Sequence, residues 1–567
     1  MDIKTYGPAK LLIKNNVRIL ELRGTEEEMA FQHGTLLAQD IQKGPIPYLS
    51  KKFEFELQND GPLKKHPLLQ KVVLKYMDWV FKHLIAYIPL EYKKVVKALS
   101  TAANISEMDI LRAASMPDAM TILSRHAAGR FFLKKQNIQT FGCTSFIVLG
   151  EMTQTQELMQ GRNLDFPVAE YWDKYASVLY CYPKEGQKYC SITSGGIQVP
   201  GVTGFNESGL ILAIHQLFST HVTSHGMPVV ILCDEIVRKA KTINEAIEIV
   251  KNIKRAGNWA ISLASHKEKR AVVIETSPSQ VYVRESTNGL IAQSNFCFSE
   301  KLKNHEMFFN LTTAEDNHFR HDRLIDECQR LKGQMDEKKG IALLGDHFDQ
   351  KSQATKAIGR VVSTIYNVQS AFFRPEQKKF WVSTGMAPAN LSDFMELPFD
   401  FDWNLETYDF NRKISPNPFI HTHQGEAMRA YTKAYDYFSN DKDFEKTVEC
   451  LNQALAQDSS EFAFHLAKGF MLLKLRRFDE ALKAFEVGKT ITLSVHESAL
   501  LNLFQGRSLD LLNRRSEALS FYAPYLETIK IDHKLQKAFQ RSYQRSYKDK
   551  DIDKTIFQFI FADFLAY

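Results

Sequence analysis

A cysteine directly after a glycine opens a short apolar run in GCTSFIVLG, residues 142–150. A peptide bond before cysteine can rearrange: the thiol attacks the preceding carbonyl, the acyl group moves to sulfur, and water releases it. Gly142 would leave that carbonyl unshielded and would tolerate the strained backbone that the attack requires. Cleavage would free an α-amine on Cys143, ordinarily of pKa about 7.7 to 8.0. That amine can serve as general base to its own thiol, whereas a cysteine left inside the chain would need a histidine.

Two charged residues follow in MQGRNLDFP, residues 159–167. Arg162 and Asp165 return beside Cys143 if this run and the preceding one pair as antiparallel strands. Asp165 could then hold or orient the α-amine, and Arg162 could lower the thiol pKa or hold a carbonyl oxygen. A surface Arg–Asp pair on a turn explains the pattern equally well.

GCTS followed by GRNLDF resembles the cysteine N-terminal-nucleophile (Ntn) hydrolases. The nearest resemblance is to the acyl-coenzyme A:6-aminopenicillanic acid acyltransferase family, which is related to acid ceramidase, N-acylethanolamine acid amidase and choloylglycine hydrolase. Further motifs follow in the family's order within residues 18–390, namely RGTEEEMAFQHGTLLA, GVTGFNESGLILA, WAISLASHKEKRAVVIETSP, LIAQSNFCFS and KKFWVSTGMAP. The ordered set is more specific than any single motif.

The resemblance implies a role for four of these residues. Cys143 matches the nucleophile that autocleavage after Gly142 exposes, and Arg162 and Asp165 match the charged pair that flanks it.

Two asparagines also match family positions. Asn295 matches the residue whose amide steadies the oxyanion, a donor whose loss typically costs about 100- to 1000-fold in rate. Asn206, in GFNESG, matches a second asparagine, which we assign to substrate binding or to the turn itself. The family often has Asn-His where this chain has Asn295-Phe296.

The activity implied by the resemblance is hydrolysis or transfer of an acyl group at a linear, non-peptide amide or an acyl-thioester. The acyl group would pass through a thioester on Cys143, and water or an amine would then release it. The expected small-molecule partner is an amide with a fatty or aryl acyl chain, or an acyl-coenzyme A donor. This chemistry requires no metal and no organic cofactor.

Two other functions stay open: a catalytically dead Ntn fold that acts as a repeat scaffold, and an unprocessed Cys-His peptidase. The peptidase would need one of three histidines as its base, His215, His225 or His266. A fourth pattern, HFRHDR at residues 318–323, lacks a partner motif for a metal site and is typical of a polar helix start.

Helical patterns and β-like runs alternate up to about residue 400, which predicts an α+β domain. Residues 65–125 and 228–256 read as helices, and Thr25 with Glu28 has the spacing of a capping box. Short strands are predicted from residue 141 onward. The resemblance implies a four-layer αββα Ntn-hydrolase domain, with residues 1–142 as an N-terminal helical segment and propeptide and residues 143–400 as the catalytic core.

The remainder of the chain differs in character. Residues 401–424 are polar and proline-containing, and we predict a linker or a closing strap. Residues 425–567 repeat with a period near 34, as in Phe444 and Phe478, and Gly469 is echoed by Gly506. This pattern resembles tetratricopeptide repeats, whose concave surface would bind a protein or peptide. The basic tail with its doubled QRSY is expected to form a solvated amphipathic helix rather than an anion-binding surface.

Composition sets the remaining limits. The 567 residues carry a net charge of only +6, which does not favour nucleic-acid binding. Residues 72–89 are apolar but hold charges at near-helical spacing, so we expect a packed helix and no transmembrane segment. Seven cysteines without CxxC pairs indicate reduced thiols and hence a cytoplasmic protein.

Overall fold

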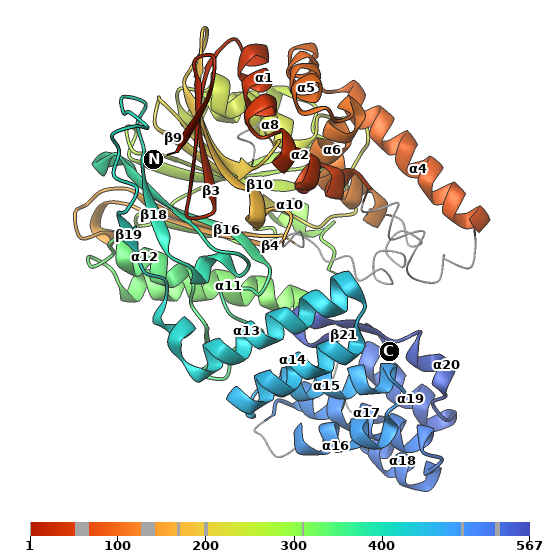
Figure 1. Cartoon of the computed structure of the whole chain (residues 1–567). Coiled ribbons are helices and arrows are strands. Elements are labelled where there is room, and N and C mark those ends of the chain that lie inside the picture. Colours follow the sequence, from red (N-terminus) through yellow and green to blue (C-terminus); the bar gives the residue numbers. More distant parts are fainter. Residues whose placement is uncertain are drawn as a thin grey trace. The chain divides into compact units, whose positions relative to one another are not determined.

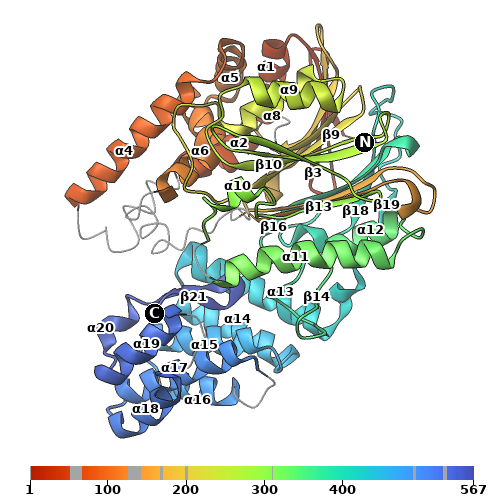
Figure 2. The same cartoon turned by 180° about the vertical axis from the view of Figure 1, so that it is seen from behind.

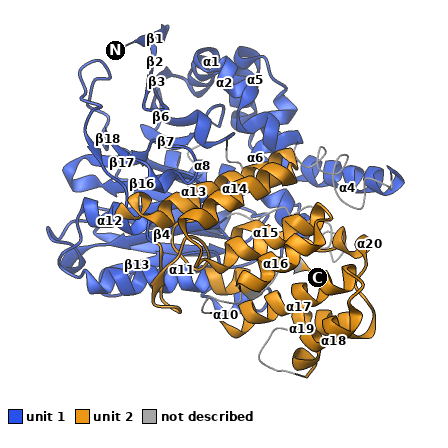
Figure 3. Cartoon of the chain, turned by 60° about the horizontal axis from the view of Figure 1, so that its bottom comes forward, with its two compact units in different colours: residues 1–308, 317–346, 366–417 blue, residues 309–316, 347–365, 418–567 orange. Residues whose placement is uncertain are grey.

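The computed structural model describes residues 2–51, 67–125, 142–166, 170–197, 202–308, 311–488, 493–527 and 533–567. The chain divides into two compact units (Figure 3). Unit 1 comprises residues 1–308, 317–346 and 366–417, and unit 2 comprises residues 309–316, 347–365 and 418–567. Each unit is described by itself.

Unit 1 contains two large sheets. The first has ten strands in the order β1 (Ile3–Tyr6), β2 (Ala9–Lys14), β3 (Val17–Gly24), β6 (Ala176–Pro183), β7 (Tyr189–Ser194), β8 (Thr203–Asn206), β9 (Leu210–Gln216), β10 (Trp259–Ser265), β11 (Arg270–Thr276) and β12 (Val281–Glu285). The second has seven, in the order β13 (Leu290–Gln293), β4 (Gly142–Val148), β5 (Met159–Asp165), β16 (Asn367–Arg374), β17 (Lys379–Ser383), β18 (Phe394–Pro398) and β19 (Lys413–Ile414). Neighbouring strands are antiparallel except β3 and β6, which are parallel.

The two sheets pack face to face over one apolar core. Phe205 of β8 lies in this core with Phe373 of β16 and Phe380 of β17, and its ring centroid is 5.2 Å from that of Phe380. Because alternate residues of a strand point to opposite faces, the inner face of each sheet supplies these apolar side chains. Leu405 and Phe410 are buried in the same core. Residues 401–417 therefore belong to unit 1 and help to close its core.

Helices cover the outer faces of both sheets (Figure 1 and Figure 2). α8 (Val229–Lys239) and α9 (Ile243–Asn252) pack on the ten-stranded sheet, and α12 (Glu337–Leu344) packs on the seven-stranded sheet beside α11 (Leu311–Arg330). The remaining helices of unit 1 are α1 (Glu26–Leu36), α2 (Ala38–Lys43), α4 (Pro67–Ala86), α5 (Leu90–Ala103), α6 (Glu107–Arg125) and α10 (Glu300–Lys303). The predicted α+β class is thus confirmed. In unit 1, helices lie on the outer side of each of the two packed sheets.

The N-terminal segment differs from the helical prediction in its first residues. Residues 3–24 form β1 to β3, because β3 lies between β2 and β6 and finds hydrogen-bonding partners on both sides. Helices begin at α1, where Thr25 and Glu28 make both hydrogen bonds of the predicted capping box. No helix in the described ranges is long and apolar enough to cross a membrane.

Unit 2 is mainly helical. Its helices are α13 (His423–Asp436), α14 (Phe444–Gln457), α15 (Phe462–Lys474), α16 (Phe478–Gly488), α17 (Val495–Leu511), α18 (Arg515–Tyr522), α19 (His533–Gln544) and α20 (Asp549–Ile552). Two short hairpins accompany them, β14 (Phe348–Asp349) with β15 (Ala354–Thr355), and β20 (Ile556–Gln558) with β21 (Asp563–Ala566).

Consecutive helices of unit 2 pack against each other through equivalent contacts. A side chain at Gly469 of α15 would meet the ring of Phe485 on α16 at 2.3 Å, so only glycine permits this approach. Gly506 of α17 stands in the same relation to Tyr522 of α18, at 2.4 Å. The two helix pairs therefore use one packing solution twice.

Candidate active site

The register between β4 and β5 brings the charged pair to Cys143. Gly142 lies opposite Asp165, and Ser145 lies opposite Arg162. The predicted antiparallel pairing of these two runs is therefore confirmed. β13 pairs with the other edge of β4, so the chain that follows β13 also reaches the start of β4.

The thiol of Cys143 is buried beside a guanidinium group. Arg162 Nη2 lies 3.3 Å from Cys143 Sγ and also donates to the carbonyl of Ile214 at 3.0 Å. Arg162 Nη1 donates to the carbonyl of Asn163. These backbone acceptors fix the guanidinium against the sulfur, in the only orientation that satisfies them together.

Opposing influences act on this thiol. Burial raises the pKa of Cys143, the positive charge of Arg162 lowers it, and the negative charge of Asp165 raises it. The net direction is upward, so the thiol of the intact chain holds its proton. A base next to the sulfur is therefore needed before it can act as a nucleophile.

Asn295 holds the backbone nitrogen of the same cysteine. Cys143 N donates to Asn295 Oδ1 at 2.7 Å, and Asn295 Nδ2 donates to the carbonyl of Gln216 at 3.0 Å. The amide orientation follows from the partners, because a backbone N–H can only donate and a carbonyl can only accept. In this arrangement one of the two N–H groups of Asn295 Nδ2 donates to Gln216, and the acceptor Oδ1 faces Cys143.

Arg320 of α11 joins this cluster, and sequence reasoning missed it. Arg320 Nη1 donates to the carbonyl of Cys143 at 3.1 Å and lies 3.0 Å from Thr144 Oγ1, while Nη2 donates to Asn295 Oδ1 at 3.2 Å. It is almost fully buried, and it lies inside the HFRHDR stretch that was interpreted only as a polar helix start. The sequence feature that could have indicated a buried role for Arg320 is its position among residues of mixed polarity in the middle of a helix.

Two histidines of the same stretch pack against Phe296, the residue that stands where the family often has histidine. The ring of Phe296 packs against His318, with centroids 4.0 Å apart, and against His321 at 5.3 Å. These histidines thus form an aromatic cluster with Phe296.

Asp165 lies beside the peptide bond between Gly142 and Cys143. A Cβ atom on Gly142 would stand 3.1 Å from Asp165 Cβ and 2.9 Å from Tyr366 Oη, so the strand approaches closely only because residue 142 is glycine. Asn367 Nδ2 donates to Asp165 Oδ1 at 2.8 Å and orients the carboxylate. The carboxylate is thus held next to the carbonyl that autocleavage would attack.

Of the three histidines considered as bases, His215 contacts the backbone of Cys143, whereas His225 and His266 lie in other environments. His215 Nε2 lies 2.9 Å from Ser145 Oγ and 3.1 Å from Ser262 Oγ, and burial holds the pKa of His215 well below its usual range. His225 lies against the ring of His83, and His266 against that of Phe399.

Asn206 is placed at the turn between β8 and β9. Its Nδ2 donates to the carbonyls of Val237 and Ala240 at 2.9 Å each, and its Oδ1 accepts from Leu210 N at 3.1 Å. The side chain therefore ties this turn to the end of α8 and is not brought to Cys143.

An apolar cavity of about 60 Å³ opens beside Cys143. Aromatic side chains and aliphatic side chains from several elements form its walls, among them Tyr92, Phe166, Trp172, Trp259, Leu164 and Ile214. Such a lining suits an apolar group beside the sulfur.

Residues 152–387 match the family model for acyl-coenzyme A:6-aminopenicillanic acid acyl-transferase. The match contains Arg162, Asp165, Asn206 and Asn295 and begins nine residues after Cys143. The resemblance inferred from the ordered motifs is therefore confirmed for this part of the chain.

Two curated proteins are similar to this chain over about half its length. An uncharacterized protein of Archaeoglobus fulgidus is 22% identical over 279 residues, which cover 48% of this chain and 45% of that protein. Protein dcd1B of Dictyostelium discoideum is 23% identical over 281 residues, which cover 47% of this chain and 52% of that protein. The chain thus spans about half the length of the curated relatives it matches.

Proposed function

We propose that the chain is an autoprocessing cysteine Ntn-hydrolase that hydrolyses or transfers an acyl group through a thioester on Cys143. The observation that carries this proposal is the convergence of Arg162, Asp165 and Asn295 on a buried thiol that directly follows a glycine. The family match over residues 152–387 supports acyltransferase or hydrolase chemistry of the Ntn type. The helix–sheet–sheet–helix layering of unit 1 is consistent with the four-layer Ntn fold.

Processing would begin at the peptide bond between Gly142 and Cys143. The sulfur bonds to the carbonyl carbon of Gly142, the C–N bond breaks, and the thiol proton passes to the released amine. Water then cleaves the thioester, leaving a carboxylate on Gly142 and a free thiol and α-amine on Cys143. Asp165 is placed to stabilise that amine as a cation, because it lies directly opposite Gly142 in the strand register.

The new α-amine would then serve as the base in turnover. It takes the proton of its own thiol, and the thiolate attacks the acyl carbonyl of the substrate. The leaving amine or thiol takes a proton from the α-ammonium group, and water or an acceptor amine attacks the resulting thioester. Arg162, at 3.3 Å from the sulfur, stabilises the thiolate.

Asn295 would position the amine rather than the oxyanion. Its Oδ1 already accepts from Cys143 N, and its Nδ2 already donates to Gln216. Nδ2 carries a second hydrogen, but the atom of Asn295 that faces Cys143 is the acceptor Oδ1. We therefore assign Asn295 to holding the α-amine, and Arg320 to holding Cys143 and Asn295 together.

The apolar cavity favours a substrate with a fatty or aryl acyl chain. Its aromatic walls stand next to the sulfur, where the acyl group of a thioester would lie. The donor would be a linear amide or an acyl-coenzyme A thioester. Unit 2 would act as a tetratricopeptide-like module for a protein or peptide partner, and a cytoplasmic location remains a prediction from the seven unpaired cysteines.

Intact-mass measurement of the purified chain tests the proposal. Processing would give fragments of about 16 and 49 kDa from the 65.1 kDa chain. Cys143→Ala should abolish both cleavage and turnover of N-acyl amides and acyl-coenzyme A donors, whereas the control Cys450→Ala, at a buried cysteine of unit 2, should retain both. A full-length protein that traps an acyl-thiol reagent at Cys143 would indicate an unprocessed peptidase instead. A full-length protein that does not react would indicate a scaffold.

A further inference from the structure

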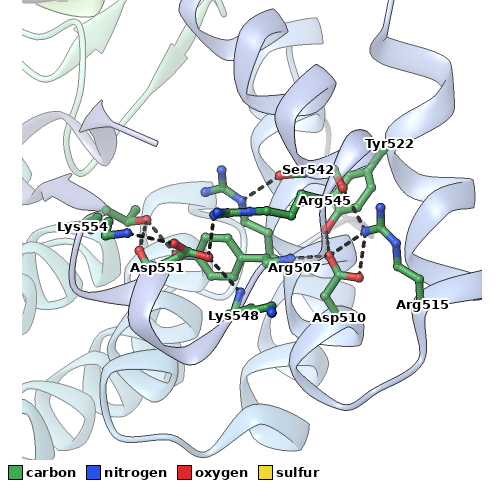
Figure 4. Close-up of polar contacts among 11 residues, drawn as sticks. Arg507, Asp510, Arg515, Tyr522, Ser542, Arg545, Lys548, Asp551 and Lys554 are labelled. Carbon is green, nitrogen blue, oxygen red and sulfur yellow. Dashed lines mark hydrogen bonds and ion pairs between the residues drawn. The ribbon is translucent and has the colours of Figure 1, made fainter.

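Arg507 of α17 is a buried cation without a counter-ion in the described part of unit 2. Only 3% of the residue is exposed, and its Nη1 has no hydrogen-bond partner. Its Nε donates to Ser542 Oγ at 3.4 Å, and its guanidinium carbon lies 4.4 Å from the ring centroid of Tyr547 (Figure 4). Burial lowers the pKa of Arg507, but an arginine remains charged.

The nearest carboxylate on the same helix is already occupied. Asp510 pairs with Arg515 at 2.9 Å, accepts from Tyr522 Oη at 3.0 Å and accepts from Tyr547 N at 2.9 Å. Figure 4 shows Asp510 directed at Arg515 and Tyr522. Arg507 is therefore left uncompensated although Asp510 is only three residues away.

Arg507 lines a cavity of about 410 Å³ that is strongly basic. Its charged side chains are four cations, Arg507, Arg541, Arg545 and Lys554, and one carboxylate, Asp551. Asp551 pairs with Arg545 at 3.0 Å and with Lys554 at 3.3 Å, so it neutralises neither Arg507 nor Arg541. Ser542, Ser546 and Tyr567 also line the cavity, although the hydroxyl of Tyr567 donates to Asp563 at 3.3 Å.

The doubled QRSY of the tail, residues 540–547, builds one wall of this cavity. α19 has the amphipathic character expected of this segment, with Leu535, Ala538 and Phe539 buried. Its opposite side, however, supplies Arg541 and continues to Arg545 and Tyr547 at the cavity.

We infer that this cavity binds the terminal phosphate group of a small soluble molecule. A buried guanidinium without a partner is unfavourable unless an anion joins it, and arginine forms paired hydrogen bonds with phosphate oxygens. Several cations around one cavity favour a dianion over a single carboxylate. The cavity is larger than a phosphate ion and within the size range of small-molecule sites, so the rest of the ligand has room.

The burial of Arg507 decides between a small molecule and a macromolecule. A membrane surface or a nucleic-acid backbone reaches exposed cations, whereas only a protruding terminal group reaches a guanidinium that is 3% exposed. The inference concerns unit 2 alone and does not depend on the chemistry proposed for Cys143.

Calorimetric titration of the full chain in chloride buffer tests this inference, with inorganic phosphate, O-phosphoserine and pyrophosphate as probes. We expect saturable binding that Arg541→Ala weakens about tenfold or more, the loss typical of one charge-assisted hydrogen bond. Arg507→Met should abolish binding. In phosphate-free buffer Arg507→Met should unfold at no lower temperature than the wild type, because it removes an uncompensated charge. Arg514→Ala is the matched control, since Arg514 pairs with Glu517 on the surface, and it should bind normally.

Three outcomes would overturn the inference. The first is no binding of any phosphate probe, and the second is binding that neither Arg507→Met nor Arg541→Ala weakens. The third is capture by phosphatidic-acid vesicles or an oligothymidylate that depends on Arg541 while the soluble phosphates do not bind. Cys143→Ala should bind the probes like the wild type, which separates this result from failure of the proposed catalysis. If Arg507→Met does not fold, Arg541→Ala decides alone, because Arg541 is exposed and makes no ion pair within the described residues.

Discussion

Replacing Arg162 by glutamine removes the cation nearest to the proposed nucleophile. At 3.3 Å from Cys143 Sγ, a unit charge in a medium of effective dielectric constant about 20 stabilises a thiolate by ~5 kcal/mol. Asp165 acts in the opposite direction, so the net loss should be smaller. Only the weaker effect of Arg320 would then oppose the rise that burial causes in the thiol pKa, so we expect the thiolate population at neutral pH to fall about ten- to thousandfold.

The assay is the rate of alkylation of Cys143 by iodoacetamide as a function of pH. Peptide mass spectrometry must localise the label, because the chain has seven cysteines. Arg162→Lys keeps the charge and should retain most of the reactivity, and thermal unfolding of both variants reports any loss of the bond to Ile214. Identical pH profiles for the wild type and Arg162→Gln would refute the electrostatic role of Arg162.

Two further predictions concern a positioning side chain and a buried carboxyl group. Asn295→Asp keeps the oxygen that faces Cys143 N and removes the donor to Gln216. The rate of processing, measured by gel electrophoresis, and kcat should therefore both fall less than tenfold. An oxyanion role would instead lower kcat about 100- to 1000-fold. Burial raises the pKa of Asp118 from 3.8 to about 6, so the folded state keeps this proton longer than the unfolded state does. The contribution of the protonated group to the free energy of unfolding is complete below pH 4 and is lost as the pH rises to 6, a change of ~3 kcal/mol. Asp118→Asn should remove this pH dependence from the free energies obtained by urea unfolding. Parallel curves for the two proteins between pH 4 and 7 would contradict that assignment.

The part of the site that could be predicted from sequence lies on two adjacent strands. Arg162 and Asp165 return beside Cys143 because β4 and β5 follow each other closely and pair in antiparallel fashion. Sequence reasoning had only to assume that pairing.

The missed residues come from distant parts of the chain. Arg320 is 177 residues from Cys143, and Asn367 is 202 residues from Asp165. These contacts depend on strand order and on the helix layer over the sheet, which no local pattern encodes. In unit 2 the contacts are local: Phe485 and Tyr522 each lie 16 residues after the glycine they cover. The repeat in the sequence was therefore enough to predict that these positions are equivalent.

Contacts between residues far apart in the chain also determine whether the two fragments would stay together after the proposed cleavage. Residues before the proposed cleavage site form part of the apolar cavity beside Cys143, including Tyr92, Ile110 and Pro117. The N-terminal fragment also carries β1 to β3, which hydrogen-bond to the ten-stranded sheet through β6. Asp118 of α6 accepts from Val229 N at 2.8 Å and from Trp259 Nε1 at 2.9 Å, which links the two fragments again.

Cleavage of one peptide bond breaks none of these contacts, so both fragments should remain associated. On gel filtration without denaturant they should elute together at the mass of the intact chain, and they should separate only in denaturant. The N-terminal segment would then be a permanent part of the acyl site rather than a discarded propeptide. Substitution of Tyr92 by alanine, in the N-terminal fragment, should accordingly change the preferred acyl chain without changing the rate of processing. Loss of the N-terminal fragment with full retention of activity would contradict this view of the cavity.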